Sequence, residues 1–149
     1  MTRDHSVNLS EYQALADFRY QLRRFVRFAE EAARQAGLEP QHHQLMLAIK
    51  GRPAEEEPRI AYLAERLQIQ HHSAVELVDR LVRKGLVKRT RAQQDRREVH
   101  VQLTPRGERI LGQLTLHTRA ELQSAAPALV AALGELTSPP RKTPARRAK

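Results

Sequence analysis

The stretch HHSAVELVDRLVRKGLVKRTRAQQDRREVHVQLTP, residues 71–105, joins a helical pattern, a cationic segment and an alternating pattern. Its first part has apolar side chains at i, i+3, i+4, i+7 and i+8, which predicts a helix with one buried stripe: Ala74, Leu77, Val78, Leu81 and Val82. Gly85 suits the position just after such a helix. Residues 86–92 predict a short strand, a polar turn follows, and residues 99–103 predict a second strand with Val99, Val101 and Leu103 on one face.

The segments on either side add further helices. Asn8 and Glu11 have the spacing of a capping box before a long run of helical periodicity, and Thr104 can cap a helix with Pro105 at its first position. The last apolar segment contains Pro127, which predicts a kink or a restart there. The helices are predicted over residues 9–36, 40–51, 60–69, 71–84, 105–123 and 124–136.

This order of elements predicts the fold class. The helices at 60–69 and 71–84 have the length and tight connection of a helix-turn-helix, and a β-hairpin follows directly. The chain is therefore expected to be mostly α, a winged helix-turn-helix with a two-stranded β-wing and long helices at both ends. Such a helix is shaped to lie in a DNA major groove, with a basic hairpin reaching beside it.

The positive charge is concentrated in two segments. The chain has a net charge of +9, of which residues 79–97 carry +6 and residues 138–149 carry +5, so the remainder carries −2. A local basic surface is typical of a protein that meets a polyanion, although a single charge run is more often a solvated face. The last twelve residues have nothing apolar to bury, so residues 138–149 are predicted to be a disordered basic tail.

Residues 63–111 resemble the MarR family of bacterial transcription regulators. The most specific match is D-x-R, then alternating apolar residues, then L-T-x-x-G: Asp95, Arg97, Val99, Val101, Leu103, Thr104 and Gly107. The "LVDRL" and "KGLV" blocks, which begin at Leu77 and Lys84, precede it at the family's distance. The order of helices extends the resemblance over about residues 9–136.

The resemblance implies a homodimer that binds a pseudo-palindromic double-stranded DNA site. Residues 1–137 would form one domain, with a DNA-binding lobe at about 40–104 and dimerisation helices at 9–36 and 105–136. The helix 71–84, here called the recognition helix, would read bases, while Arg97 would enter the minor groove and Asp95 would orient it. The candidate DNA-binding residues are His71, His72, Ser73, Glu76, Arg80, Arg89, Arg91, Asp95, Arg96 and Arg97.

One residue departs from the family pattern. Glu76 stands where relatives commonly have arginine in the recognition helix. A carboxylate repels phosphate but accepts a hydrogen bond from cytosine N4. Either Glu76 reads a different base sequence from that of arginine-bearing relatives, or it does not contact DNA.

Many relatives repress a nearby operon and leave DNA when a small, often phenolic, molecule binds. The chain is therefore expected to be a repressor released by a small organic effector. The residues considered for an effector site are Tyr20, whose hydroxyl could bind a ligand while its ring packs, and His42 and His43, which either border a pocket or lie on the surface.

Other functional classes have weaker support in the sequence. No nucleophile or H-E-x-x-H motif occurs, and "GERILG" at residues 107–112 lacks the following Lys-Ser/Thr of a phosphate loop, so no enzyme activity and no cofactor are expected. A metal-sensing regulator is the lesser alternative. Histidines occur in adjacent pairs, which point about 100° apart on a helix and do not chelate one ion, so no metal site is expected.

The main alternative is a winged-helix module for protein association or for architectural, non-specific DNA binding. Polar rather than uniformly cationic residues on the recognition helix argue for sequence-specific binding. The chain has no cysteine, no apolar leader and no run long enough to span a membrane, so it is expected to be a cytoplasmic protein without a membrane partner.

Overall fold

The computed structural model describes residues 6–139 in two compact units. Residues 27–120 form one unit, here called the lobe; the other, here called the terminal unit, comprises the described residues 6–26 and 121–139. The elements are α1 (Leu9–Gln35), α2 (Pro40–Lys50), α3 (Ile60–Leu67), α4 (His71–Arg83), β1 (Val87–Arg91), β2 (Val99–Leu103) and α5 (Pro105–Thr137). The chain is mostly helical with one two-stranded sheet, as predicted.

The lobe is organised around one apolar core. Leu45 and Met46 of α2, Leu63 of α3, Leu81 of α4 and Val101 of β2 are completely buried in it. Each element of the helix-turn-helix and the hairpin therefore contributes at least one side chain to the same cluster. Burial of apolar surface stabilises the folded chain by about 25 cal/mol per Å², and this burial holds the short elements together.

The ends of the helices follow from particular residues. Asn8 and Glu11 form the predicted capping box: the Glu11 N–H donates to Asn8 Oδ1 at 3.0 Å, and the Asn8 N–H donates to Glu11 Oε2 at 2.8 Å. Gly37 ends the turn after α1 and Gly85 ends α4, with φ values of 78° and 71°. These left-handed conformations favour glycine because a Cβ would clash with the backbone.

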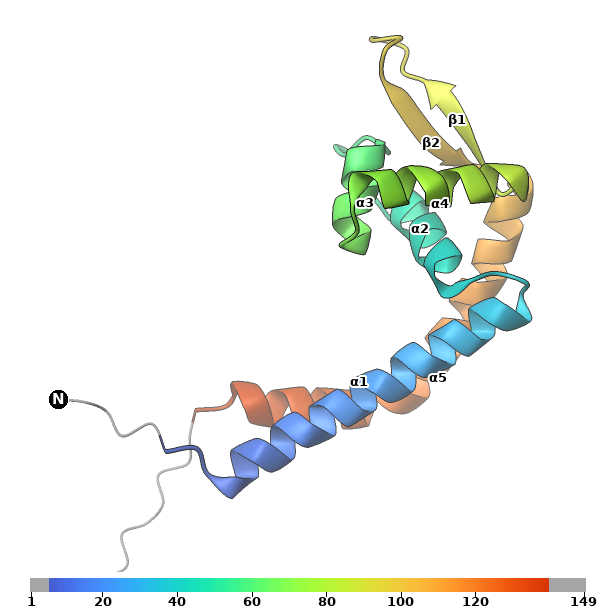
Figure 1. The fold of residues 1–149 in the computed structure, drawn as a ribbon. Coiled ribbons are helices and arrows are strands. Elements are labelled where there is room, and N and C mark those ends of the chain that lie inside the picture. The colour runs from blue at the N-terminus through green and yellow to red at the C-terminus, as the bar shows by residue number, and fades with distance from the viewer. Residues whose placement is uncertain (1–5, 140–149) are drawn as a thin grey trace, which may run out of the picture. The chain divides into compact units, whose positions relative to one another are not determined.

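β1 and β2 form an antiparallel hairpin, the wing, which extends away from α2, α3 and α4 (Figure 1). Val87 pairs with Leu103 at its root, and Arg91 pairs with Val99 near its tip. The root is tied to the lobe because the Val101 N–H donates to the carbonyl of Pro58 at 2.9 Å. The tip, residues 92–98, lies beyond this anchor.

Two details of the predicted secondary structure are wrong. Residues 105–137 form one helix that continues through Pro127, not two helices with a restart. Pro127 and Gln123, the residue one turn earlier, are not buried, so water can bind the carbonyl that the missing N–H leaves free. Val82, expected in the buried stripe of α4, is 37% exposed, because the buried face of the helix is limited to Ala74, Leu77, Val78 and Leu81.

The terminal unit leaves much apolar surface uncovered within a single chain. Ala14 and Ala132 are buried in it, but the larger apolar side chains remain exposed: Leu9, Tyr12, Leu15, Leu22, Val26, Val130 and Leu133. Among residues 6–139, no helix is both long and apolar enough to cross a bilayer.

Candidate nucleic-acid interface

The turn before α4 sets the direction of that helix. α3 ends at Gln68, which adopts a left-handed conformation with φ 53° and whose side-chain amide donates to the Glu65 carbonyl at 2.8 Å. Two residues later, Gln70 is extended and α4 begins at His71. A non-glycine residue in this region is uncommon, and here its side chain satisfies a carbonyl at the end of α3.

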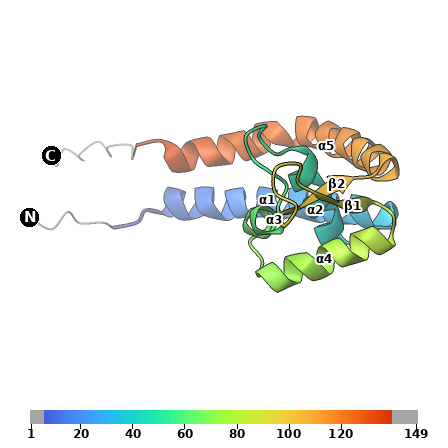
Figure 2. The same ribbon diagram turned by 90° about the horizontal axis from the view of Figure 1, so that it is seen from above.

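Burial of one face of α4 fixes which side chains face outward. Ala74, Leu77, Val78 and Leu81 are buried against the lobe. His71, His72 and Glu76 are exposed, and Ser73 is half-buried beside them. α4 lies at one side of the lobe, with α2 and α3 behind it (Figure 2). The first two turns therefore present imidazole, hydroxyl and carboxylate groups to solvent without a lysine or arginine among them.

Some of the cations predicted to contact DNA also contact other groups of the lobe. Arg89 of β1 forms an ion pair with Asp79 of α4, and Arg91 Nη1 donates to the Arg96 carbonyl across the wing at 2.7 Å. These two side chains connect parts of the lobe, a role that the sequence did not reveal. Arg80 Nη1 lies 3.9 Å from Glu39 Oε2 and remains half-exposed.

Arg96 and Arg97 are exposed at the wing tip, and within residues 6–139 their side chains take part in no ion pair or hydrogen bond. Asp95 Oδ1 accepts from the Arg97 backbone N–H at 2.9 Å, and the Asp95 carbonyl accepts from the Glu98 N–H at 3.0 Å. Asp95 thus shapes the backbone that carries Arg97, while the Arg97 guanidinium is free to meet a ligand.

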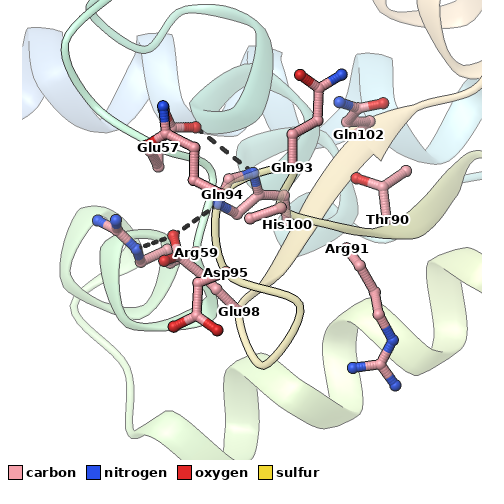
Figure 3. Close-up of a pocket in the computed structure, with 11 residues that line it drawn as sticks. Glu57, Arg59, Thr90, Arg91, Gln93, Gln94, Asp95, Glu98, His100 and Gln102 are labelled. Atoms are coloured by element: carbon pink, nitrogen blue, oxygen red, sulfur yellow. Dashed lines mark hydrogen bonds and ion pairs between the residues drawn. The ribbon is translucent and has the colours of Figure 1, made fainter.

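A hollow of about 550 Å³ lies beside the wing, between the tip and the loop that precedes α3 (Figure 3). Glu98 of the wing forms an ion pair with Arg59, and its Oε1 lies 2.7 Å from His100 Nε2. These hydrogen bonds, first from His100 and then from Arg59, lower the pKa of Glu98, and the Glu98 carboxylate in turn raises the pKa of Arg59. Glu98 directly precedes β2 and His100 lies within that strand, but nothing local in the sequence indicates their partners.

The three candidate effector residues lie in different surroundings. His42 and His43 are buried in α2 of the lobe, so the surface alternative for them is wrong; burial lowers the pKa of both. The His42 Nδ1 accepts from the Glu39 N–H at 3.3 Å, while its Nε2 is buried without a hydrogen-bond partner among the described residues. Tyr20 belongs to the terminal unit, where it is exposed and the Arg24 guanidinium lies 5.8 Å from its ring centroid.

Two other expectations concern metal and the tail. No group of three or more histidine, aspartate or glutamate residues within 6–139 is arranged to hold a metal ion. All five cations of the predicted tail, residues 138–149, lie outside the described residues.

A two-stranded wing directly after a helix-turn-helix, with its tip arginines exposed, defines a winged-helix protein. Residues 36–98 match the model of the MarR family, and no curated protein sequence matches the chain. Residues 36–98 of the lobe are therefore similar to the MarR family of transcription regulators, which confirms the resemblance found in residues 63–111.

Several solved structures share the fold. AbsC, a MarR family transcriptional regulator from Streptomyces coelicolor, superposes with a TM-score of 0.70 at 19% identity, covering 89% of this chain and 90% of its own. A point mutant of MepR from S. aureus, bound to an oligodeoxyribonucleotide, gives 0.62 at 20% identity, covering 78% and 82%. CouR from Rhodococcus jostii RHA1, bound to p-coumaroyl-CoA, gives 0.59 at 19% identity, covering 80% and 87%.

Proposed function

We propose that the protein is a sequence-specific DNA-binding transcription regulator, and that it represses transcription until a small-molecule ligand releases it from DNA. The observation that carries the proposal is the pairing of two surfaces in one lobe. The outward face of α4 offers base-reading groups, and the neighbouring wing tip offers two arginines without partners among the described residues. The match of residues 36–98 to the MarR family supports the same function.

The recognition helix supplies the specificity in this proposal. His72, Ser73 and Glu76 lie on the first two turns of α4, the part that enters the major groove in helix-turn-helix proteins. Imidazole and hydroxyl groups donate or accept hydrogen bonds at base edges, and a carboxylate accepts from cytosine N4. A non-specific architectural binder would instead need mainly lysine and arginine on this face.

The wing supplies affinity from the backbone and the minor groove. Arg97 at the wing tip is free to enter a narrow, A·T-rich minor groove, where the negative potential is concentrated. Arg96 can bind phosphate nearby, and both contacts would weaken as salt is added.

The active species in this proposal is a two-fold homodimer. The exposed apolar side chains of the terminal unit, including Leu15, Leu22, Val130 and Leu133, would be covered by the same surface of a second copy. Two recognition helices would then meet half-sites about 10 base pairs apart on a pseudo-palindrome. Light scattering at micromolar concentration tests this assembly, and a monomer would contradict it.

Ligand release is supported by the candidate residues and by one relative. CouR has been solved with p-coumaroyl-CoA bound. In this chain the buried Nε2 of His42 has no hydrogen-bond partner among the described residues, so it is available to a ligand that reaches it. His43 and Tyr20 are the other candidate contacts. Adding phenolic acids and their CoA thioesters to a protein–DNA complex tests release directly.

The division of labour between helix and wing is the sharpest test of the proposal. The protein first selects a duplex from a random-sequence pool. Binding affinity is then measured on duplexes altered in the half-sites or in the flanks, for wild type and for the variants Arg97→Ala, Ser73→Ala and Glu76→Ala. Arg97→Ala should weaken binding and lose flank preference, and the helix variants should change half-site preference by ~1–3 kcal/mol.

Two outcomes would contradict the proposal. If no sequence were enriched from the pool, the protein would not be sequence-specific and the architectural alternative would be favoured. If Arg97→Ala changed half-site preference while the helix variants did not, the assigned roles would be wrong. Repression is tested separately, by in vitro transcription from a promoter that overlaps the selected site.

A further inference from the structure

Arg59 connects the helix-turn-helix to the wing (Figure 3). It directly precedes α3 as the N-cap residue of that helix. Its guanidinium donates a hydrogen bond to the carboxylate of Glu98 and forms an ion pair with it, here called the brace. Glu98 directly precedes β2 and is the last residue of the wing tip. The brace therefore joins the two elements that the proposed function places on DNA.

The backbone of Glu98 closes the turn of the wing tip. Its N–H donates to the Asp95 carbonyl at 3.0 Å, and its carbonyl accepts from the Ala92 N–H at 2.9 Å. Arg97, the exposed cation of the tip, is the residue immediately before it. A contact that fixes Glu98 therefore also fixes the turn that carries Arg97.

The loop that carries Arg59 is held on its other side. The Arg52 side chain donates twice to the backbone of this segment, from Nη1 to the Ile49 carbonyl at 3.0 Å and from Nε to the Glu56 carbonyl at 3.1 Å. These bonds tie the end of α2 to the loop before α3. Arg59 is thus presented to the wing from a segment that is attached to the lobe.

The brace is separate from the attachment of the root of the wing. The root is held by the backbone bond from Val101 to the Pro58 carbonyl, which does not need the Arg59 side chain. His100 also makes a hydrogen bond with Glu98, but both residues belong to the wing. Among the described residues, Arg59 is the only one outside the wing whose side chain binds the Glu98 carboxylate.

We propose that Arg59 is a positioning residue for DNA binding, which acts through Glu98 to hold the wing tip in a fixed place relative to the recognition helix. Arg97 and the recognition helix can then meet DNA together. Without the brace the tip has more freedom, and DNA binding must remove that freedom at a cost in affinity. This inference rests on the proposed DNA-binding function.

Replacing Glu98 separates positioning from simple electrostatics, because the two effects have opposite signs. Loss of an acidic group near DNA should raise affinity if charge alone matters, whereas loss of the brace should lower it. The test uses the full-length wild type, Glu98→Ala and Glu55→Ala, with fluorescence anisotropy on the duplex that the wild type selects from a random-sequence pool. Glu55→Ala is the matched control, because it removes the same charge from an exposed position in the loop before α3.

Glu98→Ala should weaken binding by about two- to fivefold, the strength of one partly exposed ion pair. Glu55→Ala should bind as tightly as wild type or slightly more tightly. The inference is overturned if Glu98→Ala binds as tightly as wild type or more so, or if Glu55→Ala loses as much affinity as Glu98→Ala.

A double-mutant cycle asks whether Arg59 acts through the tip. Arg59→Ala and Arg97→Ala are measured alone and together on the same duplex, and independent effects would add. If the brace places Arg97, then Arg97→Ala should cost less affinity in the Arg59→Ala background than in wild type. Equal costs in the two backgrounds would mean that Arg59 does not position Arg97.

A further measurement needs no DNA and separates this inference from the proposed function. Backbone ¹⁵N relaxation of the free protein should report more motion of residues 92–97 in Arg59→Ala and Glu98→Ala than in wild type or Glu55→Ala, with residues 71–83 unchanged. If no duplex is selected, the proposed function fails while the brace is still judged here. Unchanged motion of the tip in Arg59→Ala overturns the brace, and so does an equal loosening of α4, which would show that Arg59 only stabilises the lobe as a whole.

Discussion

Replacing Gly107 with alanine should destabilise the lobe by acting on the root of the wing. Gly107 is buried in the first turn of α5, where an added Cβ would lie 2.1 Å from the carbonyl oxygen of Leu86 and 3.1 Å from its carbonyl carbon. Both are backbone atoms, so the overlap cannot be relieved by the rotation of a side chain. The same Leu86 oxygen accepts the Thr104 N–H at 3.0 Å, which joins the start of β1 to the end of β2.

The magnitude follows from two opposing effects. Alanine is favoured over glycine inside a helix by roughly 0.5–1 kcal/mol. Relieving the overlap requires the start of α5 and Leu86 to separate by about 1 Å, and forcing such overpacking typically costs ~1–3 kcal/mol or more. The clash exceeds the gain in helix propensity, so Gly107→Ala should lower the free energy of unfolding by ~1–2 kcal/mol, or the melting temperature by roughly 2–8 °C.

The assay is urea unfolding followed by circular dichroism at one fixed protein concentration. Gly112→Ala is the matched control, since Gly112 lies on the same helix and a Cβ there meets nothing within 4 Å. That variant should be more stable than wild type by up to about 1 kcal/mol. The reasoning is refuted if Gly107→Ala is as stable as wild type, or if the two variants shift in the same direction.

Three further predictions concern charge. Burial lowers the pKa of His42 and His43, so at pH values below 6.5 the unfolded chain binds protons that the folded chain does not. The urea concentration at the unfolding midpoint should therefore fall as the pH drops from 7.5 to 5.5. The fall should be smaller in a His43→Gln variant. Deleting residues 138–149 should leave the urea midpoint unchanged but flatten the salt dependence of binding to random-sequence DNA, and an unchanged slope would show that the tail does not touch DNA. A double-mutant cycle with alanine at Asp79 and Arg89 tests whether this half-exposed ion pair acts only between protein groups. If it does, DNA affinity should fall by a similar factor in both single variants and little further in the double variant. Additive losses would instead indicate that Arg89 contacts DNA.

The fold of the lobe could be predicted because its signals are local. The stripe of α4, the glycines that end helices and the alternation in β2 each depend on residues within about one or two turns of each other. Gly85 at φ 71° and Thr104 at the start of α5 lie where the sequence placed them. The break at Pro127 was wrong because a proline on a solvent-accessible helix face costs less than one inside a core.

The contacts of the candidate site could be predicted only in part, because charge and exposure at a position do not reveal a distant partner. Arg89 and Arg97 have the same side chain in the same basic segment, yet Arg89 is paired with Asp79 and Arg97 is free of such contacts among the described residues. Arg59 and Glu98 are 39 positions apart, and only the folded lobe brings them together. The sequence therefore does not indicate which of the predicted DNA contacts also bind within the protein.

In the proposed function, the arrangement of charge in this lobe would separate affinity from specificity. From His71 to Asp79 the recognition helix has no lysine or arginine and carries two carboxylates, one of which is paired with Arg89. On DNA, the outward face of its first two turns would therefore gain little from phosphate, and Glu76 would disfavour any site that offers it no donor. Attraction to the DNA backbone would then come from exposed cations outside this face, among them Arg96 and Arg97 at the wing tip and those of residues 138–149, which act on every sequence. The base sequence would be chosen by an α4 surface that rejects poor partners, so the wing would set how tightly the protein binds rather than which sequence it selects.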